Sequence, residues 1–129
     1  MSSSPLAIAR TCLNAYVDKD RAAIEAVLAD DFHFTSPIDN ALDRATYLAR
    51  CWPNSAKTQS FEYLCEIEQG ERAFIVYEAH ATDGRCFRNA EVHTVRDDKL
   101  IAIEVYFGWK VPHNAPVGGF IENDGAGHA

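Results

Sequence analysis

The chain has few basic residues for its length. Its 129 residues include 12 lysines and arginines against 19 aspartates and glutamates, which gives a formal net charge of −7. Nucleic-acid binding requires clustered positive charge to neutralise phosphates, and binding to an anionic membrane surface requires the same. We therefore expect neither nucleic acid nor a membrane among its partners.

Paired cysteines and long apolar runs are also absent. The four cysteines, Cys12, Cys51, Cys65 and Cys86, form no C-x-x-C pair, so the spacing predicts neither a zinc site nor a redox motif. Because 47% of the residues are hydrophobic, the chain can build a core without disulfides, and we expect four reduced thiols. No uncharged apolar stretch approaches the roughly 20 residues of a membrane helix, and the first residues lack a signal-peptide pattern. We expect a cytoplasmic protein with no metal and no cofactor.

Apolar residues at spacings of three and four predict three helices in the first half of the chain. The first covers residues 5 to 18. The second covers residues 21 to 29 with Asp20 as its cap, and the third begins after a cap at Asp43 and ends at residue 51 or 52.

Alternating residues predict strands between and after these helices. The predicted strands are residues 32 to 35, 60 to 68 and 72 to 82, followed by the two arms of a hairpin over 86 to 109. Helices followed by antiparallel strands predict a single α+β domain, which we place at residues 1 to 110. The glycine- and proline-containing segment from 111 to 129 is expected to be an irregular tail.

The hairpin from Cys86 to Trp109 separates two chemistries, because successive strand residues point to opposite faces of a sheet. With a regular tight turn at Asp97-Asp98, one face is mostly apolar and carries Arg88, Ala90, Val92, Thr94, Ile101, Ile103, Val105, Phe107 and Trp109. The other face is more polar and carries Asn89, Glu91, His93, Ala102, Glu104 and Tyr106.

The order of these elements resembles the nuclear transport factor 2-like (cystatin-like) superfamily, and the ending RDDKLIAIEVYFG is most similar to its SnoaL-like branch. The resemblance extends over residues 6 to 109 and includes the DDFHFTSP strand. It implies a cone-shaped fold in which a curved mixed or antiparallel sheet wraps around three N-terminal helices and leaves an apolar pocket. Members include steroid isomerases, polyketide cyclases, dehydratases and epoxide hydrolases as well as binding domains, and they are commonly dimers.

The positions that carry catalysis in these families lack the expected groups. The resemblance places the general base of the steroid isomerases at Ser36 and their oxyanion-hole tyrosine near Cys12. It places their second acid near Val92 and the acid of the cyclases near Val105. None of these side chains performs the proton transfer of a positioned carboxylate. Tyr16, one helical turn after Cys12, is the nearest substitute for the tyrosine.

The pairing of strands 60–68 and 72–82 depends on the turn at residues 69–71. A three-residue turn gives one apolar face that joins Phe61, Tyr63, Cys65 and Ile67 to Ile75, Tyr77 and Ala79. A two-residue turn instead sets Glu62 and Glu66 beside Tyr77. We prefer the first register because it gives two coherent faces. The predicted pocket is then lined by Cys12, Tyr16, Phe34, Ser36, Tyr63, Tyr77, Arg88, Ala90, Val92, Ile103, Val105, Phe107 and Trp109.

Three residues are candidates for a variant catalytic set. Tyr16 replaces the missing tyrosine, Asp39 replaces the missing base, and Arg88 clamps a ligand carboxylate or stabilises an enolate. Each also has a structural interpretation. Tyr16 is then a core aromatic and Asp39 a turn residue. Arg88 is an arginine at the rim that either pairs with an acidic neighbour or extends its charged end to water.

The polar strand face has two interpretations. Glu78, His80, Glu91, His93 and Glu104 form either a metal or acid–base cluster or a solvated or dimer-facing surface, and their spacing matches no metal motif. We expect a homodimer through the sheet face that carries Glu91, His93 and Glu104.

The leading functional hypothesis is a SnoaL-like dimer that binds a small hydrophobic or aromatic molecule in its cone. One alternative is an isomerase, a polyketide-cyclase-like enzyme or a hydratase/lyase with a variant catalytic set. A second is a non-catalytic dimeric interaction module, because a fold does not fix a function.

Overall fold

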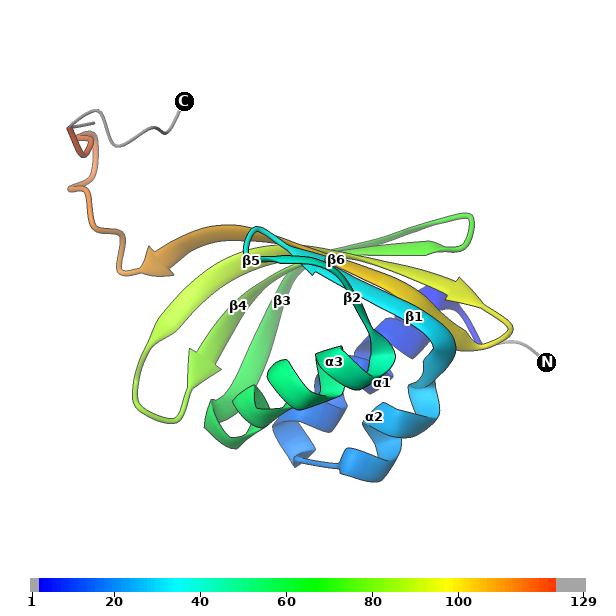
Figure 1. Cartoon of the computed structure of the whole chain (residues 1–129). Coiled ribbons are helices and arrows are strands. Elements are labelled where there is room, and N and C mark those ends of the chain that lie inside the picture. The colour runs from blue at the N-terminus through cyan, green and yellow to red at the C-terminus, as the bar shows by residue number, and fades with distance from the viewer. Residues whose placement is uncertain (1–2, 123–129) are drawn as a thin grey trace.

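The sheet and the helices form two layers. The computed structural model describes residues 3–122. The helices are α1 Pro5–Asp18, α2 Arg21–Val27, α3 Arg44–Arg50 and the 3-10 helix η1 Trp52–Lys57. The strands are β1 Leu28–Ser36 and β2 Asp39–Asp43, which precede α3, and β3 Thr58–Gln69, β4 Arg72–Ala81, β5 Cys86–Arg96 and β6 Lys99–Val111, which follow η1. The six-stranded sheet curves over the helices, which all lie on one of its sides (Figure 1). The predicted α+β cone is confirmed.

The strand order places the first strand beside the last. The sheet runs β2-β1-β6-β5-β4-β3, with β1 parallel to β6 and the other neighbours antiparallel. The β3–β4–β5–β6 meander was predicted, whereas β2 and η1 were not. β2 is only five residues long, and two of its residues, Asp39 and Asp43, have strong turn and capping preferences.

Side-chain caps fix where the helices begin. Asp20 accepts a hydrogen bond from the backbone N–H of Ala23 at 3.1 Å, and Asp43 accepts one from Thr46 at 2.8 Å. Each cap satisfies a backbone donor that has no partner within its helix. Both predicted caps are confirmed, although α2 ends at Val27 and β1 begins at Leu28, earlier than expected.

The core lies between the helices and the sheet. Its larger cluster joins the three helices to β1, β5 and β6 through fully buried residues such as Ile24, Phe32 and Leu100. A smaller cluster packs α1 against β4 through Leu13 and Ile75. The larger cluster stops short of the far ends of β5 and β6, where Phe107 and Trp109 are half-exposed.

A bulge in β6 overturns the predicted faces of the hairpin. The turn at Asp97-Asp98 has positive φ at both residues, as a two-residue hairpin turn requires, but the register shifts between Thr94 and Val95. His93 therefore lies opposite Ile103, and Glu91 lies opposite Val105. Since one extra residue exchanges the two faces of a strand, Glu91 and His93 face the helices. Their exposed fractions are 8% and 0%.

The same bulge changes which residues of β5 lie on the outer face of the sheet. Ala90 and Val92 lie opposite Tyr106 and Glu104 on the face away from the helices. The expectation that Glu91 and His93 belong to an outer, dimer-facing surface is therefore wrong for these two residues. Glu104 does lie on the outer face.

The predicted register between β3 and β4 is half right. The turn has two residues, Gly70 and Glu71, and a further register shift follows between Tyr63 and Cys65. Tyr63 consequently lies opposite Tyr77, and Phe61 opposite Ala79, on the helix-facing side as predicted. Cys65 and Ile67 lie opposite Val76 and Phe74 on the outer side, because the shift inverts this part of the strand; they were wrongly placed on the apolar face.

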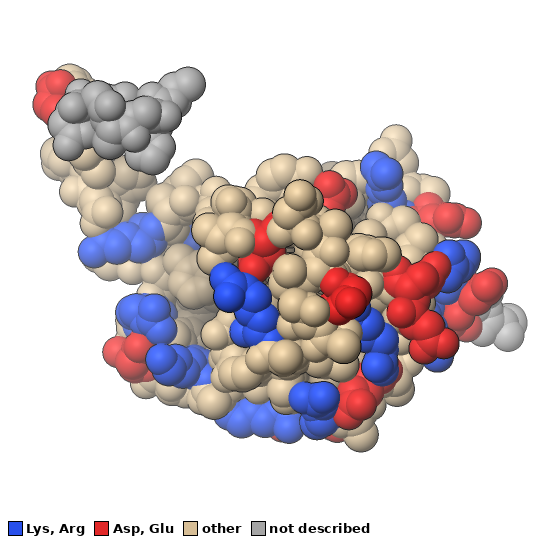
Figure 2. Space-filling view, in the orientation of Figure 1, with Lys and Arg blue, Asp and Glu red and all other residues tan. Residues whose placement is uncertain are grey.

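Charges of both signs are distributed over the domain. On the face in view, Lys and Arg lie among Asp and Glu rather than in a continuous basic patch (Figure 2). In the described part of the chain, no helix is long and apolar enough to cross a membrane. Residues 112–122 carry no helix or strand and extend away from the end of β6 (Figure 1).

Candidate functional site

An open cavity lies between the curved sheet and the helices α1 and α3. Its volume is about 560 Å³, within the roughly 300–1,000 Å³ of small-molecule sites. Much of its wall is apolar, with contributions from Leu13, Phe34, Phe61, Phe87, Ile103, Val105, Phe107 and Trp109. Polar side chains enter the wall in a few places, and these determine what the cavity can do chemically.

A pair of tyrosines stands on the helical side of the cavity. The hydroxyl oxygens of Tyr16 on α1 and Tyr47 on α3 are 2.7 Å apart. Tyr47 is buried against Phe32 and Phe34, whereas Tyr16 is part-buried and packs edge-on against Trp52. Burial raises the pKa of both phenols well above the ordinary value of 10.0, so both stay protonated at neutral pH.

A carboxylate lies on the sheet side of the same cavity. Glu91 on β5 accepts a hydrogen bond from the Tyr77 hydroxyl at 2.5 Å through Oε2, and its Oε1 lies 2.7 Å from Nε2 of His93. Asn89, two residues before Glu91 on β5, donates a hydrogen bond from its side-chain amide to the Tyr77 hydroxyl at 3.4 Å. Burial is the larger cause of the raised pKa of Tyr77, and the charge of Glu91 raises this pKa further. Tyr77 therefore keeps its proton and donates it in a hydrogen bond to the carboxylate.

The charge of the carboxylate acts on the tyrosine pair. The charge of Glu91 contributes, after burial, to the raised pKa of Cys12, Tyr16 and Tyr47. All four side chains line the cavity, so its wall carries both hydroxyl donors and a carboxylate. His93 lies behind Glu91 and outside the cavity lining.

The hydrogen bonding of His93 favours one tautomer. Its Nδ1 is buried and contacts no polar partner among the described residues. In a neutral ring that carries its proton on Nε2, the N–H donates to Glu91, and Nδ1 is only an acceptor without a partner. The Nδ1–H tautomer and the doubly protonated ring would instead bury an N–H donor without a partner, which costs free energy. We infer that His93 donates to Glu91 and orients it.

A second carboxylate lies at the first-strand turn. Asp39 on β2 accepts a hydrogen bond from the Ser36 hydroxyl at 2.8 Å and pairs with Nε of Arg50 at 2.5 Å. Burial acts to raise the pKa of Asp39, but the hydrogen bonds from Ser36 and Arg50 outweigh it and hold this pKa below 3.8. Asp39 and Ser36 both line the cavity, with Asp39 held as an ion pair.

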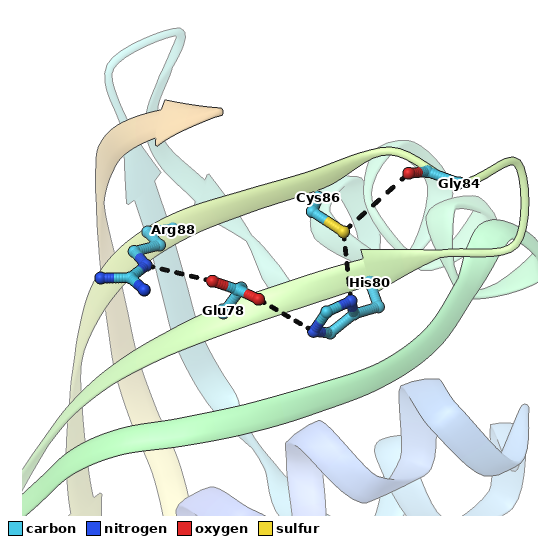
Figure 3. Close-up of polar contacts among 5 residues, drawn as sticks. All are labelled: Glu78, His80, Gly84, Cys86 and Arg88. Atoms are coloured by element: carbon cyan, nitrogen blue, oxygen red, sulfur yellow. Dashed lines mark hydrogen bonds and ion pairs between the residues drawn. The ribbon is translucent and has the colours of Figure 1, made fainter. Parts of the chain in front are cut away.

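Arg88 borders the cavity but directs its charge elsewhere. Its Nε lies 3.2 Å from Oε1 of Glu78, directly across the β4–β5 ladder on the outer face. Figure 3 shows this pair continuing to His80 and Cys86 along the hairpin. Glu62, Glu78 and His80 also offer ligand atoms within 4.8 Å of one another, so they could hold a divalent cation, although the Arg88 charge opposes one.

The structure gathers most of the predicted pocket residues around the cavity. Those in the lining are Cys12, Tyr16, Phe34, Ser36, Tyr77, Arg88, Ile103, Val105, Phe107 and Trp109. Tyr63 instead packs toward α1, with the Arg10 guanidinium 5.1 Å from its ring centre. Ala90 and Val92 lie on the outer face because of the β6 bulge.

Among the cavity residues that sequence reasoning missed, Glu91 is the carboxylate. Val92 itself lies on the outer face, and the carboxylate one position earlier faces the helices. The signal was the run of apolar residues from Leu100 to Ile103, which breaks the period of two expected for a regular strand. Such a break indicates a bulge, and a bulge exchanges the faces.

Comparison with known protein families identifies the family of this chain. A family model described as SnoaL-like domain matches residues 9–103, from α1 into β6. This chain belongs to the SnoaL-like family. The match includes Tyr16, Tyr47 and Glu91. No curated protein sequence matches the chain.

Solved structures described as NTF2-like share the fold of this SnoaL-like domain. An NTF2-like protein of unknown function from Cytophaga hutchinsonii has a TM-score of 0.68 at 14% identity and covers 84% of this chain and 93% of its own. A protein from Kribbella flavida has a TM-score of 0.74 at 18% identity, covering 83% and 88%. An LEH-like epoxide hydrolase of M. tuberculosis has a TM-score of 0.67 at 17% identity, covering 81% and 82%. At these identities the likeness shows the fold alone.

Proposed function

We propose that this SnoaL-like protein binds a small, mostly apolar molecule bearing a carbonyl group and catalyses proton transfer at the carbon beside that carbonyl, as an isomerase does. The observation that carries the proposal is the shared location of Glu91 and the Tyr16–Tyr47 pair in an apolar cavity. A base and a hydrogen-bond donor on opposite walls are the two groups that enolisation requires.

Tyr16 is the donor toward the ligand. Because Tyr47 is the more deeply buried of the pair, the arrangement in which Tyr47 donates to Tyr16 leaves the Tyr16 hydroxyl proton directed to the cavity. The raised pKa keeps that proton on Tyr16 at neutral pH. A ligand carbonyl oxygen within reach would accept this hydrogen bond, which strengthens as negative charge develops on the oxygen.

Glu91 is the base. Each of its oxygens already has one hydrogen-bond partner, and each retains a second lone pair. The carboxylate takes a proton from the ligand carbon, the C–H electrons form a carbon–carbon double bond, and the carbonyl electrons move to oxygen. Return of the proton to the same or another carbon completes an exchange or an isomerisation. Tyr77 and His93 hold the carboxylate in position.

Hydrogen–deuterium exchange tests the reaction class without knowledge of the natural substrate. In D₂O, the protein should accelerate exchange of the protons beside the carbonyl of β-tetralone, followed by NMR. Glu91→Gln should lower the enzymatic rate by about a hundredfold or more, because the amide cannot accept the proton. Glu104→Gln is the matched control, since Glu104 lies on the outer face of the neighbouring strand, and it should leave the rate unchanged.

A binding protein without turnover is the second candidate. It is favoured by the contacts of Glu91, since a carboxylate held by both Tyr77 and His93 is also a stable structural element. The probe for this case is β-naphthol, whose fluorescence reports burial and whose hydroxyl can meet the tyrosine pair. Saturable binding of β-naphthol with no exchange of β-tetralone in the wild type would reject catalysis and retain the binding function.

A further inference from the structure

A second constellation lies on the outer face of the sheet, at the end of the β4–β5 hairpin. The Sγ of Cys86 lies 3.1 Å from Nδ1 of His80, and Nε2 of His80 lies 3.2 Å from Oε2 of Glu78. Cys86 and His80 face one another directly across the β4–β5 ladder. Figure 3 shows the side chains in one continuous row along the hairpin, with Arg88 at its other end.

The contacts define a consistent arrangement of protons. A neutral His80 with its proton on Nε2 donates to Glu78 and presents the Nδ1 lone pair to the Cys86 thiol. Arg88 in turn fixes Glu78 by donating to its other oxygen at 3.2 Å. A nucleophile in contact with a base, and a base oriented by a carboxylate, is the pattern of an activated side chain.

The other cysteines lack this arrangement. Cys12 and Cys51 are buried in the core. Cys65 is exposed on β3, and within residues 3–122 its thiol contacts no imidazole or carboxylate at hydrogen-bond distance. Cys86 is half-buried, so a small reagent can reach it. The chain therefore contains one thiol with a base and one exposed thiol without a base, which serves as an internal reference.

We propose that Cys86 is a modification site that exchanges with low-molecular-weight disulfides, with His80 as its base. The Cys86 sulfur attacks one sulfur of the disulfide as His80 takes the thiol proton. The new S–S bond forms as the old one breaks, and the leaving thiolate receives the proton from His80. The products are a mixed disulfide at Cys86 and one free thiol, so the disulfide itself is the oxidant.

The surface location favours a disulfide over an acyl substrate. Acyl transfer requires donors that stabilise a developing oxyanion, whereas attack on a disulfide needs only access and a proton acceptor. Besides His80, Cys86 makes a hydrogen bond to the carbonyl oxygen of Gly84 at 3.9 Å, and this oxygen is an acceptor. His80 and Arg88 also border the cavity, but Glu91, the proposed base of the cavity, lies on the opposite face of β5 from Cys86.

Reaction with glutathione disulfide tests the proposal on the full chain. The assay contains a chelator, so that no cation held by Glu62, Glu78 and His80 masks the base. After acid quenching, peptide mass spectrometry gives separate rates for Cys86 and Cys65. In the wild type Cys86 should react faster than the more exposed Cys65. His80→Gln should lower the reaction rate of Cys86 by about tenfold or more, because the glutamine amide cannot accept the thiol proton. The rate of Cys65 should stay unchanged.

Two results would overturn the assignment: a Cys86 rate no higher than that of Cys65, or a Cys86 rate unaffected by His80→Gln. Cys12 and Cys51 report folding in the same experiment, because buried thiols become reactive only if the variant unfolds. Glu91→Gln should leave the Cys86 rate unchanged, so failure of the ketone exchange and failure of this proposal are separate outcomes.

Discussion

At the scale of single residues, two of the hydrogen bonds that define the cavity, Tyr16–Tyr47 and Tyr77–Glu91, join positions far apart in the chain. Tyr16 was identified as the substitute for a missing donor because it lies one helical turn after Cys12. Its partner Tyr47 is 31 residues away in the chain, and local patterns carry no information about that contact. Glu91 was assigned to the wrong face, so its role in the cavity could not be predicted from residue alternation.

Asp39 makes the stability of the protein depend on pH. The Ser36 and Arg50 hydrogen bonds hold its folded-state pKa below the ordinary 3.8, despite burial that acts in the opposite direction. Asp39 therefore contributes stability that is complete well above pH 3.8 and is lost as the pH falls through the lower folded-state pKa. Urea unfolding measured across this acidic range should show a shallower pH dependence for Asp39→Asn than for the wild type.

Arg50→Gln provides the control for this effect, because it removes one of the two groups that stabilise the charged carboxylate. It should also flatten the acid dependence, to a smaller extent than Asp39→Asn since the Ser36 hydrogen bond remains. A pH dependence of Asp39→Asn identical to that of the wild type would contradict the assignment.

At the scale of elements, capping and periodicity located the helices, and bulges limited the prediction of the sheet. Asp20 and Asp43 act locally, so their capping roles can be predicted from a few neighbouring residues. The register of β5 on β6 depends instead on one extra residue near Ile101, which changes every later pair. β2 could not be predicted because its pairing with β1 outweighs the turn preferences of its own residues.

Gly108 marks a second irregularity, where β6 passes close to the backbone of β5. A Cβ at this position would lie 2.3 Å from the carbonyl oxygen of Arg88, and this contact is with backbone that cannot rotate away. We expect Gly108→Ala to lower the free energy of unfolding by about 2 kcal/mol or more, measured by urea denaturation.

Gly70→Ala is the matched comparison for this substitution. Gly70 has φ +60°, and a Cβ there would have no other atom within 4 Å, so alanine at this position meets only backbone strain. Its expected cost is about 1 kcal/mol. Equal losses for the two variants would show that close approach to Arg88 does not restrict position 108.

At the scale of the whole molecule, the cone architecture followed from the order of elements. Three capped helices followed by a strand meander leave few arrangements that bury both apolar faces, and the SnoaL-like resemblance selected one. The cavity extends beyond the larger core cluster, and its lining includes the half-exposed Phe107 and Trp109 near the end of β6. The identity of its polar lining therefore followed from tertiary register, which the sequence pattern alone did not determine.

The outer face of the sheet leads to the last prediction, a homodimer with a corrected contact surface. With Glu91 and His93 turned inward, this face presents Val76, Val92 and Tyr106, and Tyr106 is 55% exposed. A second copy that covers these side chains would remove their apolar surface from water. Analytical ultracentrifugation should give a dimer for the wild type and for Tyr106→Phe, whereas Tyr106→Glu should shift the equilibrium to monomer because it places a charge in the contact. A wild-type protein that sediments as a monomer at all concentrations would reject the dimer, and a Tyr106→Glu protein that remains a dimer would place the contact on another surface.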